Sequence, residues 1–331
     1  MLAQILTNPI SGASVWNGRD FLLEKTTVTF NENARQELLE FVEHLRQHPL
    51  STSLLDPNNY NLPFCRKTCD EIAHLVFNGP KFCLVNGLPI EEISTEEATA
   101  CYWLISSIIC RPVAQKLDAT MIYDVLNTDL KAQAGSGVRP DKTNIDLTFH
   151  NDNSYNVCMP EVVGLLCLKQ ARSGGLSRLM SFDTIYNELL QRSPEVLPRL
   201  YRPFWFDRQR EHYPNEDPTF SAPILVNDNG KVKVRLGLHQ VRSAYLMRGE
   251  TLDEEGQKAI KALETILSDP DLYISFSMTP GQIQFAHNLS IGHSRTHFED
   301  FEEPDRKRHL VRLWMRNYGL TSYTGKRNGL T

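Results

Sequence analysis

A histidine and an aspartate two residues apart, His150 and Asp152, together with His293 far downstream, place the strongest constraint on the fold of this chain. The pair follows a short apolar stretch that ends at Phe149. In an extended strand, residues i and i+2 point to the same side, so both side chains are able to reach one ion. A His-x-Asp pair also occurs by chance in many proteins. If His293 joins the pair, the fold must bring together segments that lie far apart in the sequence.

These three side chains form a ligand set with a specific chemistry. Two imidazoles and one carboxylate on one face of a metal ion are the ligands of non-haem Fe(II) oxygenases, in which the opposite positions stay open for a cosubstrate and O₂. The sequence therefore predicts an Fe(II) site at His150, Asp152 and His293, provided that other parts of the chain supply what such a site needs.

The middle and C-terminal parts of the chain contain many short segments with the composition of β-strands, separated by turns. Strands are predicted over residues 81–87, 121–126, 162–168, 177–181, 231–236, 273–277, 282–286 and 309–316. Helices are predicted over residues 31–47, 94–109, 182–192, 239–247 and 253–268. Short strands whose distant residues meet at one site favour an α+β fold with a mostly β core, a double-stranded β-helix (jelly roll) with flanking helices.

The 331 residues contain no internal repeat and no low-complexity stretch, which favours one domain over residues 1–331. Within it we expect an N-terminal helical and strand extension over residues 1–80. The jelly-roll core with its helical insertions is expected over residues 81–318, and a tail over 319–331.

Charge and hydropathy exclude several classes of partner. The net charge is −5 and the pI is about 6.1, so the chain has no basic field of the kind that binds nucleic acid. No apolar run approaches the roughly 20 residues that cross a membrane. The N-terminus lacks the basic and apolar regions of a secretory signal. We therefore expect a cytoplasmic protein with a small-molecule substrate, either a monomer or a homo-oligomer.

The seven cysteines are odd in number and scattered, as expected of reduced thiols. Cys65 and Cys69 are four residues apart, and Cys83 and His74 lie nearby. A zinc site would need further ligands at metal-like spacing. The sequence therefore favours free thiols here.

Two arginines near the C-terminus, Arg308 and Arg312, share one face of a predicted strand because they are four residues apart. An arginine that faces inward needs an anionic partner, since an unpaired buried charge is costly. Its guanidinium is suited to a bidentate grip on a carboxylate. Two interpretations of Arg308 stay open: it binds an anionic cosubstrate, or it pairs with an acidic residue between 302 and 305 or lies on a solvated edge.

A pair of glycines, Gly174 and Gly175, precedes Leu176 and Ser177. Glycines allow a positive φ or a close backbone approach. An ordinary hairpin is the commoner meaning of Gly-Gly, so the turn gains interest only from its neighbours.

Several motifs occur in one order along the chain: His150–Tyr155, Leu166–Ala171, Gly174–Ser177, Pro280–Phe285, His293–Thr296 and Arg308–Trp314. Together they resemble the taurine dioxygenase/clavaminate synthase-like family of Fe(II)/2-oxoglutarate oxygenases. The order, the spacing and the residue types agree over roughly residues 80–318.

The resemblance implies a role for each matching residue. His150, Asp152 and His293 take the places of the iron ligands. Arg308 takes the place of the arginine that binds the distal carboxylate of 2-oxoglutarate. Ser177 stands where many members have a threonine that also contacts this carboxylate.

The substrate contacts follow less directly from the resemblance. Arg312 matches an arginine that in some members binds an acidic group of the substrate. Asn153, Ser154 and Tyr155 follow the ligand pair and are candidates to line the substrate pocket. For each of these residues, a structural role in the core or at the surface is the alternative.

Three further features have open interpretations. Asp124, Asn127 and Asp129 are candidates to receive an ammonium group, with a surface loop as the alternative. His287 stands where members often have asparagine. The segment 205–208 is expected in a lid or a subunit contact.

As the resemblance implies, the cofactors are Fe(II), 2-oxoglutarate and O₂, and the reaction oxidises an unactivated C–H bond while succinate and CO₂ are released. Hydroxylation is the default outcome, and desaturation or ring formation are alternatives that the ligands do not distinguish. Asp152 argues against halogenation, because related halogenases have a small residue in its place. The expected substrate is small and anionic or amino-acid-like. A protein or chromatin substrate and a catalytically inactive metal-binding jelly roll are the competing interpretations.

Overall fold

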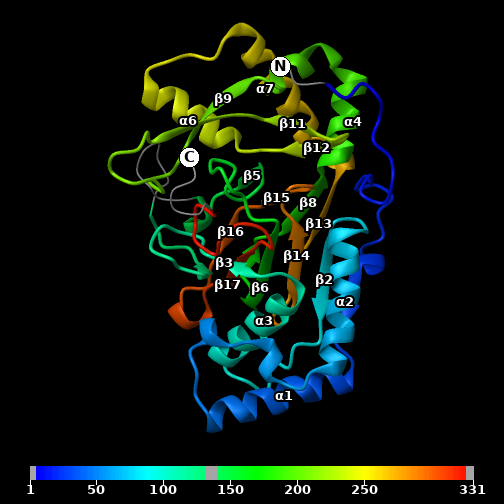
Figure 1. The fold of residues 1–331 in the computed structure, drawn as a ribbon, viewed down its shortest axis with the longest axis vertical. Helices are drawn as coiled ribbons and strands as arrows, with labels where there is room; N and C mark the ends of the chain where they lie inside the picture. Colours follow the sequence, from blue (N-terminus) through cyan, green and yellow to red (C-terminus); the bar gives the residue numbers. More distant parts are fainter. Residues whose placement is uncertain (1–4, 131–139, 326–331) are drawn as a thin grey trace.

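Two β-sheets form the centre of the structure, a computed structural model that describes residues 5–130 and 140–325 (Figure 1). The larger sheet has the strand order β1-β2-β14-β6-β17-β3, with β4 also paired to β17. Its strands are β1 (Thr27–Thr29), β2 (Phe82–Asn86), β3 (Pro112–Val113), β4 (Ile122–Val125), β6 (Val162–Lys169), β14 (Ile283–His287) and β17 (His309–Met315). The smaller sheet has the order β13-β8-β15-β5. Its strands are β5 (Leu147–His150), β8 (Ser177–Ser181), β13 (Tyr273–Phe276) and β15 (Ile291–Arg295).

The inner faces of the two sheets share a buried apolar cluster. Phe82 and Ala286 from the larger sheet pack with Leu179, Ile274 and Ile291 from the smaller one. Packing of this kind follows from strand alternation, which places every second side chain on the inner face. The predicted α+β fold with a jelly-roll core is confirmed.

Three helices cover the outer face of the larger sheet, at the lower end of Figure 1. They are α1 (Glu32–Gln47), α2 (Pro63–Phe77) and α3 (Thr95–Ile109). Strand β17 contributes side chains to both faces of the sheet. On the face covered by these helices, Val311, Leu313 and Met315 belong to the apolar cluster. The alternate residues of β17, which include Arg312 and Trp314, therefore point to the other side, where the smaller sheet lies.

Side chains cap the N-terminal ends of α1 and α3. The Asn31 side chain accepts a hydrogen bond from the Ala34 N–H at the start of α1. Ser94 and Glu97 form a reciprocal capping box at the start of α3.

Helix α2 was not predicted, although it contains the first two cysteines. Cys65 and Cys69 are buried against α1 and α3, and all seven cysteines of the chain are free thiols. Burial raises the pKa of Cys69 and of Cys83 to about 12, so these groups stay protonated and unreactive at neutral pH. The prediction of free thiols is confirmed.

A further layer covers the outer face of the smaller sheet, at the upper end of Figure 1. It contains the helices α4 (Phe182–Arg192), α5 (Leu197–Leu200), α6 (Leu238–Arg248) and α7 (Glu254–Leu267). Two hairpins complete it, β9 (Pro203–Asp207) with β10 (Thr219–Pro223), and β11 (Leu225–Asp228) with β12 (Lys231–Val234). In β9, Phe204 and Phe206 are fully buried. The segment 205–208 thus begins in a strand paired with β10, and the expectation of a lid or a subunit contact stays a prediction.

The remaining elements are short. Strands β7 (Ser173–Gly174) and β16 (Phe298–Glu299) pair with each other. The 3₁₀ helices are η1 (Leu23–Thr26), η2 (Thr52–Leu54), η3 (Pro57–Asn59), η4 (Pro140–Lys142), η5 (Pro194–Val196), η6 (Pro270–Leu272) and η7 (Pro304–Arg306). Of them, η4 leads into the segment before β5 and so into the site.

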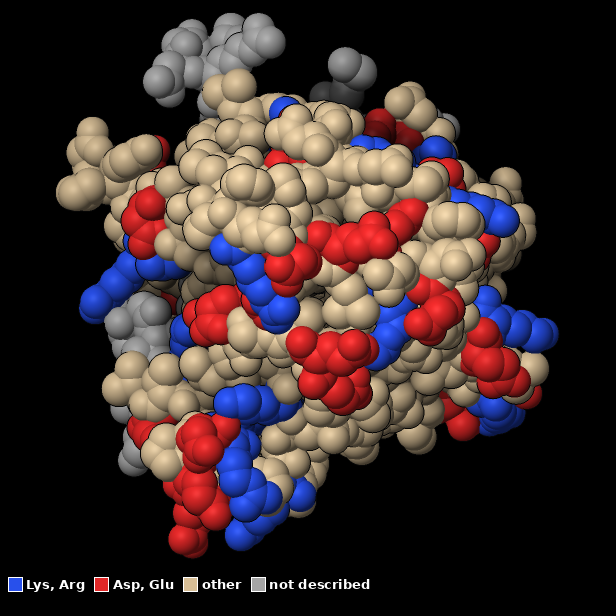
Figure 2. All heavy atoms as spheres, turned by 90° about the horizontal axis from the view of Figure 1, so that it is seen from below, with Lys and Arg blue, Asp and Glu red and all other residues tan. Residues whose placement is uncertain are grey.

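The surface carries charges of both signs. Figure 2 shows the face at the α1 end of the molecule, where basic and acidic side chains lie next to each other in small groups. On this face neither sign of charge forms one continuous patch. Among the residues that the structure describes, no helix has both the length and the apolar character needed to cross a membrane.

Candidate metal centre and its cavities

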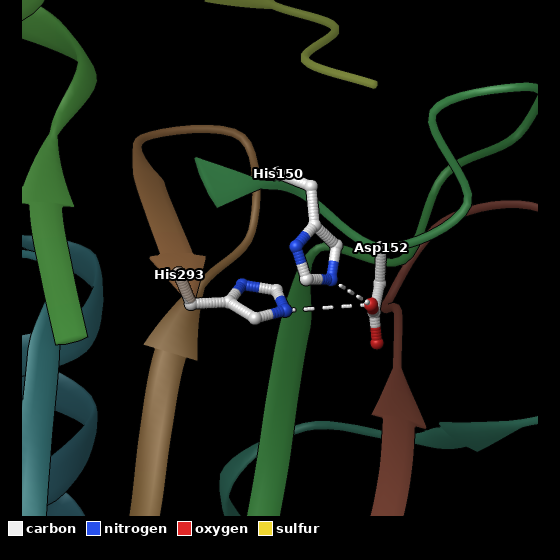
Figure 3. Close-up of side chains that lie close together, drawn as sticks. All are labelled: His150, Asp152 and His293. Atoms are coloured by element: carbon white, nitrogen blue, oxygen red, sulfur yellow. Dashed lines mark ion pairs between the residues drawn. The ribbon is translucent and has the colours of Figure 1, made fainter. Parts of the chain in front are cut away.

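The three residues predicted to bind metal come together at one point of the fold (Figure 3). His150 on β5 and His293 on β15 are direct neighbours across the antiparallel pair. The Asp152 Oδ1 atom lies 3.6 Å from His150 Nε2 and 3.4 Å from His293 Nε2. The candidate ligand atoms all lie within 4.8 Å of one another. Segments that are far apart in the sequence thus meet as expected.

The chain reaches Asp152 through a turn rather than along a strand, because β5 ends at His150. Two buried asparagines fix this turn. The Asn151 amide bonds to backbone groups of 234–236 and to the Asn288 carbonyl. The Asn288 side chain accepts the Asp152 N–H at 2.8 Å and donates to the Asp152 carbonyl at 2.9 Å. Asn288 therefore positions the carboxylate, a role that the sequence did not reveal.

His287, the neighbour of Asn288, stands outside the site. It is half-buried at the end of β14, with its ring edge-on to Phe77. Burial, helped by Lys81, lowers the pKa of His287 to about 4, so the ring is neutral. It lines neither cavity at the metal centre.

The second oxygen of Asp152 is held by residues of β17. Asp152 Oδ2 accepts a 2.6 Å hydrogen bond from Trp314 Nε1 and lies 3.3 Å from Arg312 Nη1. Burial alone would raise the pKa of Asp152, but Arg312 and the two imidazoles outweigh it and hold this pKa well below its ordinary value. The carboxylate is therefore ionised and oriented, with Oδ1 left for the histidines.

The donor atoms of this group fit a divalent cation. His150 Nδ1–H donates to the Thr148 carbonyl at 2.9 Å, which directs Nε2 towards Asp152. Burial and the neighbouring imidazole of His150 lower the pKa of His293. A divalent cation at this point would accept a lone pair from each Nε2 and from the Asp152 carboxylate. This is the donor set that non-haem Fe(II) sites use.

A smaller cavity of about 60 Å³ borders the metal centre on one side. Ser177 and Arg308 both line it, so the two predicted cosubstrate residues lie together. The Arg308 side chain is only 6% exposed and forms no hydrogen bond or ion pair with any described residue. Burial lowers the pKa of Arg308 to about 10, which leaves it a cation at neutral pH.

The predicted alternative for Arg308, a salt bridge to an acidic residue between 302 and 305, does not occur. Glu303 pairs with Arg306 instead. Asp300 accepts the backbone N–H of Arg308 at 2.8 Å but makes no ion pair with its guanidinium. Arg308 is therefore a buried cation that lacks a protein anion among the described residues, and a carboxylate ligand would supply one.

The Gly-Gly turn packs directly against this arginine. Gly175 has a φ of +68°, and a Cβ there would lie 3.2 Å from Arg308 Nε. Gly174 has a φ of +72°, and its Cβ would meet the His297 carbonyl oxygen at 2.2 Å. Both the positive φ and the close approach thus require glycine. The turn also leads Ser177 into the cavity.

A larger cavity of about 240 Å³ borders the metal centre on the other side. Asn153 and Tyr155 line it, as predicted, but Ser154 does not. Asn153 has a φ of +59°, and its Oδ1 accepts a 2.9 Å hydrogen bond from the Tyr323 hydroxyl. The remaining wall comes from β5 and the segment before it, from Gln209, from α6, and from Arg312 and Trp314 on β17.

Arg312 lies between the two cavities and already has protein partners. Its Nη1 is 3.0 Å from Asp141 Oδ2 and 3.3 Å from Asp152 Oδ2, and its Nε donates to Gln115 Oε1 at 2.8 Å. The expectation that Arg312 needs an anion from outside the protein is therefore not met in this state. Asp141 was missed, because no periodicity or motif marks a single acid in a loop.

The proposed ammonium receptor after β4 was wrong. Alternation along β4 directs Tyr123 towards the cluster with Leu310, so Asp124 points to the opposite face. There Asp124 Oδ1 lies 2.7 Å from His309 Nε2. Asn127 and Asp129 line neither cavity.

Comparisons with known proteins agree with this geometry. The family model described as "Taurine catabolism dioxygenase TauD, TfdA family" matches residues 42–314. An "FR-33289 synthase" of Streptomyces rubellomurinus is 27% identical over 318 residues, covering 95% of this chain and 92% of that protein. A taurine hydroxylase-like protein of Stachybotrys chartarum is 26% identical and covers 93% of this chain and 80% of its own length. A uridine-5'-phosphate dioxygenase of an Amycolatopsis species is 28% identical over 149 residues, 45% of this chain and 52% of that protein.

Solved structures show the same fold. Asparagine oxygenase, in complex with Fe(II), 2S,3S-3-hydroxyasparagine and succinate, has a TM-score of 0.65 at 18% identity and covers 90% of this chain and 94% of its own. The non-haem iron oxygenase OrfP, in complex with Fe, succinate and (3S)-hydroxy-L-Arg, has a TM-score of 0.63 at 12% identity and covers 87% and 94%.

Proposed function

The chain belongs to the taurine catabolism dioxygenase (TauD, TfdA) family of Fe(II)/2-oxoglutarate-dependent oxygenases, and from this premise we propose that it hydroxylates an unactivated C–H bond of a small, anionic or amino-acid-like substrate. Succinate and CO₂ are the coproducts. His150, Asp152 and His293 would hold the iron, and the substrate would occupy the larger cavity.

The observation that carries this proposal is the unpaired Arg308 beside the His-Asp-His group. A buried guanidinium without an acid is stable only if a ligand supplies the anion. The distal carboxylate of 2-oxoglutarate would accept hydrogen bonds from Arg308, with the Ser177 hydroxyl as a second donor. The smaller cavity thus supports the cosubstrate role.

The cofactors would supply the oxidising chemistry, and the protein would position the metal ligands and the substrate. Fe(II) bound with 2-oxoglutarate and O₂ supplies the oxidising power for C–H cleavage. Trp314 and Arg312 hold Asp152 so that Oδ1 faces the histidines. Asn288 holds the backbone of Asp152 in place. The walls of the larger cavity hold the reacting carbon close to the metal centre and limit access of other groups.

The pair Arg312–Asp141 supports an amino-acid-like substrate. A substrate carboxylate would compete with Asp141 for Arg312, and the released Asp141 would then face the substrate ammonium group. The exchange keeps every charge paired, which limits its cost. Asn153 and Tyr155 would add polar contacts from the opposite wall.

A purely anionic substrate has separate support in the name of a relative. The name of one relative, a uridine-5'-phosphate dioxygenase, indicates a phosphate ester as the substrate of that protein. Such a substrate would bind Arg312 while Asp141 turned away.

The proposal is tested by O₂ consumption and succinate release with Fe(II) and 2-oxoglutarate, screened against amino acids and small acids. Substrate-stimulated succinate release is expected. The mass of the product separates hydroxylation, which adds an oxygen, from desaturation or ring formation, which removes two hydrogens. Absence of O₂ consumption in protein that binds Fe(II) would favour the catalytically inactive jelly roll instead.

A further inference from the structure

A third cavity of about 350 Å³ lies on the outer side of the smaller sheet, towards α7. Arg178 from β8 and Ser294 from β15 form part of its wall, and Tyr273 and Glu264 lie on other sides. This cavity adjoins the larger cavity at the metal centre. The two share the wall residues Asp146, Leu147, Thr148, Leu238 and Arg242.

Arg178 has no anionic partner in the described part of the chain. Its guanidinium makes no hydrogen bond or ion pair there, although its Nε is buried, and only the Tyr273 ring lies near it, 5.3 Å away. The directly opposite residue on β15, Ser294, has a buried hydroxyl that is also without a partner. Two donors therefore stand side by side without an acceptor.

The other arginines show how unusual this is. Within residues 5–130 and 140–325, Arg178 and Arg308 stand out among the arginines, because neither side chain makes a hydrogen bond or an ion pair to the protein. The two acidic residues that line this cavity form no ion pair with Arg178. Glu264 pairs with Arg242, and Asp146 is exposed. Arg308 has a ligand in the proposed function, which leaves Arg178 as the second arginine that needs one.

We propose that Arg178 and Ser294 bind an oxyanion group, such as a phosphate, at the far end of an extended substrate. The substrate would run from the metal centre through the larger cavity and past the shared wall at Thr148 into the third cavity. Arg178 is then a specificity-determining residue that selects substrates by length and by terminal charge. The inference rests on the proposed function, because it extends the substrate site of that reaction.

The first experiment measures binding without turnover. Inorganic phosphate is titrated into the protein loaded with Fe(II) and 2-oxoglutarate, with calorimetry as the readout. Arg178→Gln should lower the affinity for phosphate at least about tenfold, since the substitution removes a charge-assisted hydrogen bond. Arg192→Gln is the matched control, because Arg192 is an exposed arginine with its own acids and should leave phosphate binding unchanged. Equal phosphate affinity in the wild type and in Arg178→Gln would overturn the proposal.

The second experiment separates a substrate group from a free anion. Phosphate monoesters of increasing length are tested for displacement of phosphate and for stimulation of succinate release. Esters above a minimum length should stimulate succinate release by the wild type but not by Arg178→Gln. If phosphate binds but no ester stimulates, the site takes a free anion and the extended substrate is refuted.

Two controls keep the result independent of neighbouring sites. Arg178 and Ser294 also border the smaller cavity, so the KM for 2-oxoglutarate is measured in Arg178→Gln. It should stay unchanged, and a marked rise would assign Arg178 to the cosubstrate and overturn the proposal. If the wild type gives no 2-oxoglutarate turnover at all, the proposed function fails, whatever the phosphate titration shows.

Discussion

The two cavities that meet at the metal centre are built in different ways. The smaller one is enclosed mostly by strands of both sheets, and Arg308, one of several charged residues in its wall, has no anionic partner among the described residues. The larger one takes much of its wall from the segment before β5, the loop at Gln209 and α6, and Arg312, which borders both cavities, is paired with Asp141 and Asp152. The smaller cavity therefore offers an unpaired arginine to an anionic ligand. In the larger cavity, Arg312 must leave Asp141 before it binds a ligand anion. Strands preserve geometry and loops vary, so this division places the common cosubstrate in the sheets and the specific substrate among the loops.

The largest effect should follow from removing a ligand of the metal centre, which both cavities border. His293→Ala removes a nitrogen ligand while β15 keeps its place, so affinity for Fe(II) should fall more than about 100-fold and O₂ consumption should cease. His212→Ala, on a loop outside the site, is the control and should behave like the wild type. Fe(II) binding is measured by equilibrium dialysis. Retention of full metal affinity in His293→Ala would separate His293 from the metal centre.

The second prediction tests the smaller cavity alone. Arg308→Ala should raise the KM for 2-oxoglutarate by about tenfold or more, because the charge-assisted pair is lost in a buried place. Arg308→Lys should restore part of the loss, since the charge returns without the fork geometry. Arg306→Ala, an exposed neighbour, is the control. Unchanged KM values in both Arg308 variants would contradict the assignment and remove the contrast between the cavities.

The third prediction concerns the support beneath the metal centre. Asn288→Ala leaves the Asp152 and Pro160 backbone groups without their buried partner, so unfolding free energy should fall by about 1–3 kcal/mol. Metal affinity should fall by about tenfold to 100-fold, because Asp152 loses its fixed position. Urea unfolding and metal titration provide the two readouts. A loss of stability with unchanged metal affinity would show that Asn288 supports the fold but not the ligand.

The smaller cavity could be predicted mainly because the family resemblance assigns Arg308, Ser177 and the histidines to it. Local rules supplied only part of this: residues four apart on a strand share a face, which groups Arg308 with Arg312 but left the partner of Arg308 open. The larger cavity could not be predicted in this way. Asp141 meets Arg312 only through the path of a loop, and a loop path depends on contacts between distant residues.

Asn288 was missed for a similar reason, and the outer layer shows the same limit. The amide of Asn288 acts on a turn from a distant segment, so no spacing in its own neighbourhood marks it. The segment 205–208 has the aromatic composition of an exposed lid as well as that of a buried strand. Its pairing with β10 and the burial of Phe206 are visible only in the structure.

The smallest and most specific effect should come from Asp141→Asn, which changes the larger cavity while Arg312 keeps Asp152 and Gln115 as partners. The substitution removes the acid that competes with a substrate anion for Arg312. A purely anionic substrate should then bind a few times more tightly, because the exchange of partners no longer costs an ion pair. An amino-acid-like substrate should bind more weakly, because the same substitution removes the acceptor of its ammonium group. The sign of the change in substrate KM, with the KM for 2-oxoglutarate as the internal control, therefore distinguishes the two substrate classes. If neither KM changes, the pair with Arg312 is structural, and the substrate does not contact this wall of the larger cavity.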